Sequence, residues 1–145
     1  MPTSFIDECL ANRANMDKNI DWAAVQPYRL RIVEGDFRPM IMSLEQNRPY
    51  ILVLDNADAK EHNFWAPDFL KTGVALDSIQ FGDKTPATGC VNGVRIKPRT
   101  QVTLRFVPVW EGRYEFRDIS FALIPTIGPT GVINVVPPRF GTVVN

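Results

Sequence analysis

The stretch Tyr50–Asp68, YILVLDNADAKEHNFWAPD, is the segment from which the fold of the chain can be predicted. It begins with four consecutive apolar residues, 51–54, which predict a buried strand. A turn-prone Asp-Asn pair ends this strand, and the loop after it contains His62, the single histidine of the chain. The loop closes with Phe64 and Trp65. A buried strand that delivers one histidine into an aromatic loop predicts a metal site, the remnant of one, or a packed corner.

Length and charge limit the classes of protein to consider. The chain has 145 residues, which predicts one domain with a substantial core. It has 16 Lys and Arg against 16 Asp and Glu, so the formal net charge is zero. Nucleic-acid binding relies on a basic surplus, so we expect no nucleic-acid partner. The basic residues Arg95, Lys97 and Arg99 are better explained as the solvated face of a strand.

The sequence also bears on location. No apolar run approaches the ~20 residues that span a bilayer, so we expect no transmembrane segment. The N-terminus lacks the features of a signal peptide, which fits either a cytoplasmic protein or the mature form of an exported, for example periplasmic, one. Cys9 and Cys90 either form a disulfide between an N-terminal segment and a long loop, in an oxidising compartment, or are two free thiols.

Helical spacing is confined to the N-terminal region. Ser4 and Asp7 resemble a capping box, and apolar residues at helical spacing predict a short amphipathic helix over about 4–14. We expect residues 1–27 to form a helical arm that covers a sheet edge or the end of a barrel.

Two-residue periodicity begins at Tyr28. Alternation is clearest over 101–106, and other short strands are expected near 28–33, 94–97, 113–118 and 132–136. Their spacing predicts an all-β fold, an antiparallel Greek-key β-sandwich with a short N-terminal helix.

Three parts of this domain are delimited by composition. The β-sandwich itself is expected over 28–136. Its long insert near 69–93 is rich in glycine and loop residues, with short strand or helical pieces. Residues 137–145 are expected to form an extended tail.

Four motifs, in this order, resemble those of the cupredoxins, which are small copper-carrying β-sandwiches. They are LDNADAKEHNFWAPDF at 54–69, VRIKPRTQVTLRF at 94–106, GRYEF at 112–116 and GPTGVINVV at 128–136. The resemblance covers most of the chain, from Tyr28 to Val136, and implies the cupredoxin fold.

The copper ligands of that family are largely missing. Its type 1 copper site takes a first histidine from the loop where this chain has His62. Asp118 stands where the family has its cysteine, no histidine lies within 121–131, and Pro129 replaces the usual methionine. Blue-copper electron transfer needs the thiolate and two imidazoles, and neither cysteine of this chain lies in the ligand loop. We therefore expect no blue-copper centre.

Asp118 has three interpretations if the strand keeps the family's register. In the first, its carboxylate points inward and pairs with His62, with an arginine or with a backbone N–H. In the second, His62 and Asp118, with Glu61 or Asp68, bind a single non-blue metal ion such as Cu(II), Zn or Fe. In the third, a bulge turns Asp118 to solvent.

The aromatic residues Phe64, Trp65, Phe69 and Trp110 either plug the end of the sandwich or form an exposed apolar patch for a protein partner. No Gly-x-Ser-x-Gly elbow, Walker loop or dinucleotide fingerprint is present. The leading interpretation is therefore a non-enzymatic, exported, cupredoxin-like binding or accessory protein, with no cofactor or one non-blue metal. The alternatives are a copper electron-transfer protein with an unusual ligand set and a small enzyme that uses His62 and Asp118 around one metal.

Overall fold

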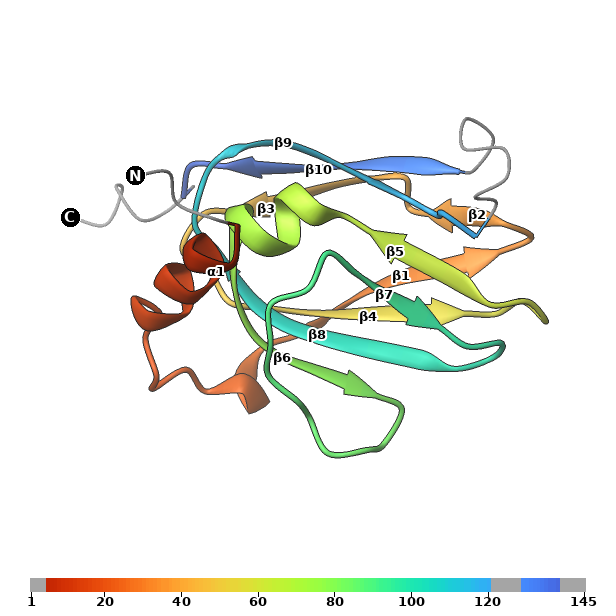
Figure 1. The fold of residues 1–145 in the computed structure, drawn as a ribbon, viewed down its shortest axis with the longest axis horizontal. Helices are drawn as coiled ribbons and strands as arrows, with labels where there is room; N and C mark the ends of the chain where they lie inside the picture. The colour runs from red at the N-terminus through yellow and green to blue at the C-terminus, as the bar shows by residue number, and fades with distance from the viewer. Residues whose placement is uncertain (1–4, 121–128, 139–145) are drawn as a thin grey trace.

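The computed structural model describes residues 5–120 and 129–138, and these build two sheets with a helical arm at one end (Figure 1). Each sheet has five strands. In order across sheet A they are β2 (Asp36–Arg38), β1 (Pro27–Val33), β4 (Tyr50–Asn56), β8 (Gln101–Pro108) and β6 (Val74–Phe81). In order across sheet B they are β3 (Ile41–Glu45), β10 (Thr130–Val136), β9 (Gly112–Arg117), β5 (His62–Trp65) and β7 (Gly93–Ile96).

The strand order confirms the predicted all-β Greek-key sandwich, because neighbours in each sheet are mostly distant in sequence. Most pairings are antiparallel, but two are parallel: β1 with β4, and β10 with β3. The chain crosses to sheet B to form β3 between β2 and β4, so β1 and β4 can lie parallel in sheet A. The 28–33 and 132–136 strands of the sequence prediction thus have the expected extent but a mixed pairing.

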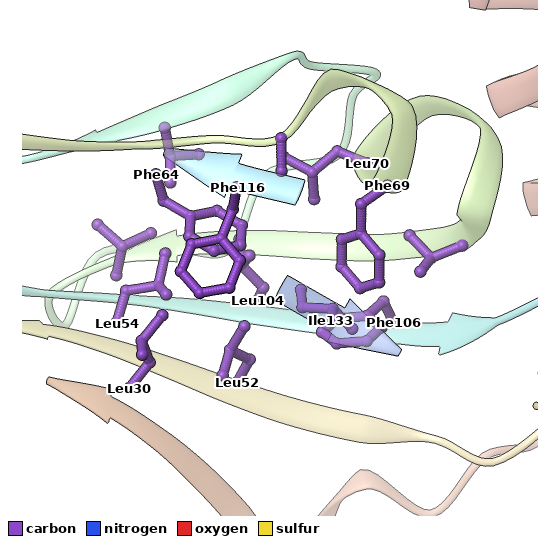
Figure 2. Packing of buried hydrophobic residues seen from close by; sticks show 14 of the residues in the cluster. Leu30, Leu52, Leu54, Phe64, Phe69, Leu70, Leu104, Phe106, Phe116 and Ile133 are labelled. Carbon is purple, nitrogen blue, oxygen red and sulfur yellow. The ribbon is translucent and has the colours of Figure 1, made fainter. Parts of the chain in front are cut away.

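The core lies between the sheets, where alternate side chains of each strand meet (Figure 2). On β8, Val102, Leu104 and Phe106 are buried while the residues between them are partly exposed or exposed. The ring of Phe64 from β5 packs 5.1 Å from the ring of Phe116 from β9. Burying one such side chain contributes roughly 1.5–3 kcal/mol, so these inward residues fix the register of the strands.

The N-terminal arm packs against the strands rather than extending from them. Its helix α1 (Phe5–Ala14) is followed by a 3-10 turn, η1 (Trp22–Ala24). The buried amide of Asn12 donates hydrogen bonds to the carbonyls of Thr72, at 2.9 Å, and Val74, at 3.1 Å. Cys9 forms a disulfide with Cys90, the first of the two arrangements that the sequence left open. The arm is therefore attached to the start of β6 and to the loop that precedes β7.

The segment predicted as a long loop insert, 69–93, is in large part regular structure. It starts with a π-helical turn, η2 (Phe69–Gly73), and continues as β6, the edge strand of sheet A. The sequence predicted only short strand or helical pieces here, and not one eight-residue strand, because five of the eight residues of β6 are buried and a bulge between Leu76 and Ser78 interrupts the alternation. Only residues 82–92 remain outside the helices and strands.

No described helix is both long enough and apolar enough to cross a membrane. The predicted tail, 137–145, lies outside the described residues except for its first two positions.

Candidate functional site

A buried asparagine at the end of β4 shapes the loop that carries the single histidine. The Asn56 side chain donates hydrogen bonds to the carbonyls of Lys60, at 2.7 Å, and Ile96, at 2.9 Å. Its oxygen accepts a hydrogen bond from the backbone N–H of Asp58 at 2.9 Å. These bonds close the loop into a compact turn, so that His62 becomes the first residue of β5 and faces inward.

The imidazole of His62 lies between two carboxylates. Its Nδ1 is 2.5 Å from Oδ2 of Asp118, and its Nε2 is 2.8 Å from Oδ2 of Asp58. The residue is only 2% exposed. An ionised carboxylate can only accept hydrogen bonds, so both contacts are satisfied when both ring nitrogens carry a proton. We call this arrangement of Asp58, His62 and Asp118 the clasp.

Asp118 follows directly after β9 and points inward on the same side of the strand as Phe116. Its second oxygen, Oδ1, accepts hydrogen bonds from the backbone N–H of Asn63, at 3.0 Å, and of Ser120, at 2.9 Å. Burial by itself would raise the pKa of Asp118. Hydrogen bonds from Ser120, His62 and Asn63 together outweigh burial, so the pKa lies below its ordinary value of 3.8. The carboxylate is therefore kept ionised, and it does not turn to solvent as the third interpretation required.

Asp58 connects the clasp to sheet A. Its Oδ1 accepts a hydrogen bond from the N–H of Glu34 at 2.7 Å, and its Oδ2 accepts one from the N–H of Gly35 at 2.8 Å. Both donors lie in the turn between β1 and β2 and have positive φ. Partial burial raises the pKa of Asp58. The two backbone hydrogen bonds and the one from His62 together outweigh burial, so the pKa lies below its ordinary value of 3.8.

Asp58 was not predicted from the sequence as part of the site. Its position offered one signal, because it lies four residues before the histidine in the same loop. Its role depends on contact with the β1–β2 turn, which a pattern within the loop does not reveal.

The predicted metal ligands are only partly brought together. His62 and Asp118 are in direct contact, whereas the Glu61 side chain is exposed and the residue contributes to this region through its carbonyl, which accepts a hydrogen bond from Ser120 Oγ at 3.3 Å. Within 5–120 and 129–138, no group of three His, Cys, Asp or Glu side chains could hold a metal ion. A non-blue metal ion at this site therefore stays a prediction.

Type 1 copper does not fit the donor atoms that this chain offers. The thiolate has no source, because Cys9 and Cys90 are bonded to each other and Asp118 occupies the position that corresponds to cysteine. The chain contains one histidine where that centre needs two.

The four aromatic residues predicted to meet a partner do not form one surface. The side chains of Phe64 and Phe69 point into the core and are fully buried (Figure 2). They therefore offer no surface to a partner. Trp65 is half-buried. Trp110 is 58% exposed and lies in the turn between β8 and β9.

The sequence matches no family model and no curated protein. Solved structures do resemble it. An oxidized amicyanin mutant is 11% identical, with 81% of this chain and 87% of that chain covered and a TM-score of 0.47. A reduced amicyanin mutant is 12% identical, with coverages of 79% and 88% and a TM-score of 0.49.

The multi-copper oxidase from Pediococcus acidilactici gives a TM-score of 0.57 at 11% identity and covers 86% of this chain. The fold is cupredoxin-like. This confirms, at the level of fold, the resemblance found in the four sequence motifs. The chain corresponds to 28% of the oxidase's length. At such low identity the cupredoxin-like comparison shows architecture alone.

Proposed function

We propose that this chain is a non-enzymatic cupredoxin-like binding or accessory protein, in which the clasp stands where the resemblance would put copper. One observation supports this above all: both ring nitrogens of His62 lie at hydrogen-bonding distance from carboxylate oxygens. A ring nitrogen whose N–H donates a hydrogen bond to a carboxylate has no lone pair to offer a metal. The imidazole is thus used entirely in holding the fold.

The clasp has a structural purpose in this proposal. Asp58 links it to the β1–β2 turn in sheet A, while Asp118 links it to β9 in sheet B. The imidazole contacts one oxygen of each carboxylate, and backbone N–H groups satisfy the remaining oxygens. The network closes this end of the sandwich without a metal.

Two further features support an exported accessory role. The disulfide between Cys9 and Cys90 is a kind of bond that persists in oxidising compartments such as the periplasm. The arm that it anchors is an addition to the β-sandwich and carries polar and exposed residues along much of its length. An added arm of this kind is suited to contact with a protein partner rather than to catalysis.

The decisive experiment measures metal content and visible absorption. Wild-type protein, His62→Ala and the exposed-neighbour control Glu61→Gln would be loaded with Cu(II), Zn or Fe and then passed through a desalting column. We expect no stoichiometric metal on any of the three and no intense blue-copper absorption.

One equivalent of metal on the wild type that is lost in His62→Ala would overturn the proposal in favour of a non-blue metal site. An additional loss in Glu61→Gln would identify the third predicted ligand. An intense charge-transfer band would instead favour a copper electron-transfer protein with an unusual ligand set.

A further inference from the structure

A cleft of about 670 Å³ lies between the N-terminal arm and sheet A. It lies at the far end of the sandwich from the clasp, since Asn47 and Pro49 before β4 and Val107 near the end of β8 line it. Figure 1 shows α1 at one end of the molecule and the β1–β2 turn at the other. The volume is in the range of small-molecule sites in proteins, which is about 300–1,000 Å³.

The walls of the cleft are largely apolar. The arm contributes one wall and the strands contribute the other, and the main apolar residues are Met16, Ile20, Val25, Ala75, Val107 and Val109. Such walls favour the apolar part of a ligand, because its transfer from water to the cleft is favourable.

The charged groups at the cleft are all acidic. Asp17 and Asp21 line it from the arm, and no lysine, arginine or histidine is among its described lining residues. Asp17 accepts a hydrogen bond from the backbone N–H of Asn19 at 2.9 Å, and no described cation forms an ion pair with either carboxylate. This side of the cleft is therefore acidic and favours a positively charged ligand.

Trp110 supplies an aromatic surface at the same cleft. Its indole is largely exposed, while its backbone is fixed by an N–H bond to the carbonyl of Gly73 at 3.2 Å. Its own carbonyl accepts a hydrogen bond from the hydroxyl of Tyr114 at 2.8 Å. The face of a tryptophan attracts organic cations through its quadrupole, and this attraction adds to that of the carboxylates.

Both walls are held in place before any ligand arrives. The amide of Asn12 and the Cys9–Cys90 disulfide attach the arm to β6 and to the loop before β7. On the opposite wall, the side chain of Gln46 donates a hydrogen bond to the carbonyl of Val109 at 2.8 Å. Because the cleft is already formed, little entropy is lost in ordering the protein when a ligand binds.

We propose that this cleft binds a small organic cation with an apolar body, such as a quaternary ammonium or an aromatic amine. The carboxylates of Asp17 and Asp21 and the face of Trp110 attract the cationic group, and the apolar body packs on apolar wall residues such as Val107. Acidic and aromatic groups without a competing basic residue select against anions, and the apolar walls select against inorganic cations.

Isothermal titration calorimetry at low ionic strength tests the proposal with three probes of similar shape: benzyltrimethylammonium, benzyl alcohol and benzenesulfonate. We expect the cation to bind saturably with one site per chain, and the neutral and anionic probes to bind at least about tenfold more weakly. The pair Asp17→Asn/Asp21→Asn should weaken binding of the cation by about tenfold. Trp110→Ala should weaken it as well, and Trp110→Phe should restore part of the affinity.

The matched control is Asp36→Asn/Asp83→Asn, which removes the same charge from exposed positions outside the cleft and should leave binding unchanged. His62→Ala should also leave it unchanged, so this test is independent of the function proposed for the clasp. The proposal is overturned if the cation does not bind saturably, if the other probes bind equally well, or if the control pair weakens binding as much as the cleft pair does.

Discussion

Nδ1 of His62 lies 2.5 Å from Oδ2 of Asp118, although the two residues are 56 positions apart in sequence. The contact joins the first residue of β5 to the residue that follows β9, and in the sequence resemblance these are the positions of a copper-ligating histidine and cysteine. In this chain the two positions hold a histidine and a carboxylate in direct contact. The behaviour of this pair under mutation and acid follows from its burial.

Removing the imidazole should strongly destabilise the fold. In His62→Ala the ionised carboxylate of Asp118 would stay buried without the imidazole that contacts it, and removing one partner of a buried pair typically costs about 3–5 kcal/mol. Urea unfolding followed by circular dichroism measures this loss. Glu61→Gln is the control, because an exposed neighbour should change the free energy of unfolding by less than about 0.5 kcal/mol. Equal losses in the two variants would contradict a structural role for the clasp.

Stability should fall in acid through the clasp carboxylates. The pKa values of Asp58 and Asp118 in the folded protein lie below 3.8, the ordinary value that applies when the chain is unfolded. As the pH drops below 3.8, the unfolded chain therefore takes up protons first, and the free energy of unfolding decreases until the folded pKa values are passed. Their contribution is fully present above this range.

The measurement is the free energy of unfolding at a series of pH values from neutral down to the acid limit. Asp118→Asn should flatten the acid part of the curve, and Asp36→Asn, at an exposed position on β2, should not. An unchanged slope in Asp118→Asn would show that its carboxyl titrates alike in the folded and unfolded states.

Gly131 should not tolerate a side chain. A Cβ at this position of β10 would lie 2.6 Å from the carbonyl oxygen of Met40 and would overlap the ring of Phe116. We expect Gly131→Ala to lower the free energy of unfolding by about 1–3 kcal/mol through overpacking. Gly89→Ala is the matched control, since nothing lies within 4 Å of its added Cβ. Similar thermal midpoints for the two variants would disprove this account of the packing.

The disulfide should stabilise the protein by restricting the unfolded chain. Cys9 and Cys90 are separated by 81 positions, so their bond removes considerable freedom from the unfolded chain. We expect Cys9→Ser/Cys90→Ser to lose roughly 2–5 kcal/mol of stability. Comparison of thermal unfolding with and without reductant measures the same effect in the wild type, and an unchanged midpoint would speak against it.

In the double variant, benzyltrimethylammonium should also bind more weakly, because the arm forms one wall of the cleft.

Sequence alone predicted the strands whose burial leaves a clear pattern, either two-residue alternation or an uninterrupted apolar run. The alternation around Leu104 on β8 and the four-residue apolar run in β4 are direct consequences of burial on the inner face or at the centre of a sheet. β6 was predicted only as short strand or helical pieces. It is covered by the core and, around Ala75, by the arm, and a bulge between Leu76 and Ser78 divides it. No two-residue period survives in such a strand.

The candidate site was predicted only in part from the sequence. The resemblance to cupredoxins aligned Asp118 with the ligand cysteine and so suggested its contact with His62. Asp58 is engaged by backbone N–H groups of the β1–β2 turn, and backbone groups carry no sequence signature. The cleft under the arm depends on how two separate elements are packed, so no motif could have indicated it.

The disulfide between Cys9 and Cys90 also determines what happens when a protease cuts the chain once. Residues 81–88 form a continuous exposed segment that lies between the two cysteines in sequence. A protease that cuts once within this segment would produce two fragments that remain tied together. Such nicked protein would migrate as a single species in denaturing gels until a thiol reagent releases the halves.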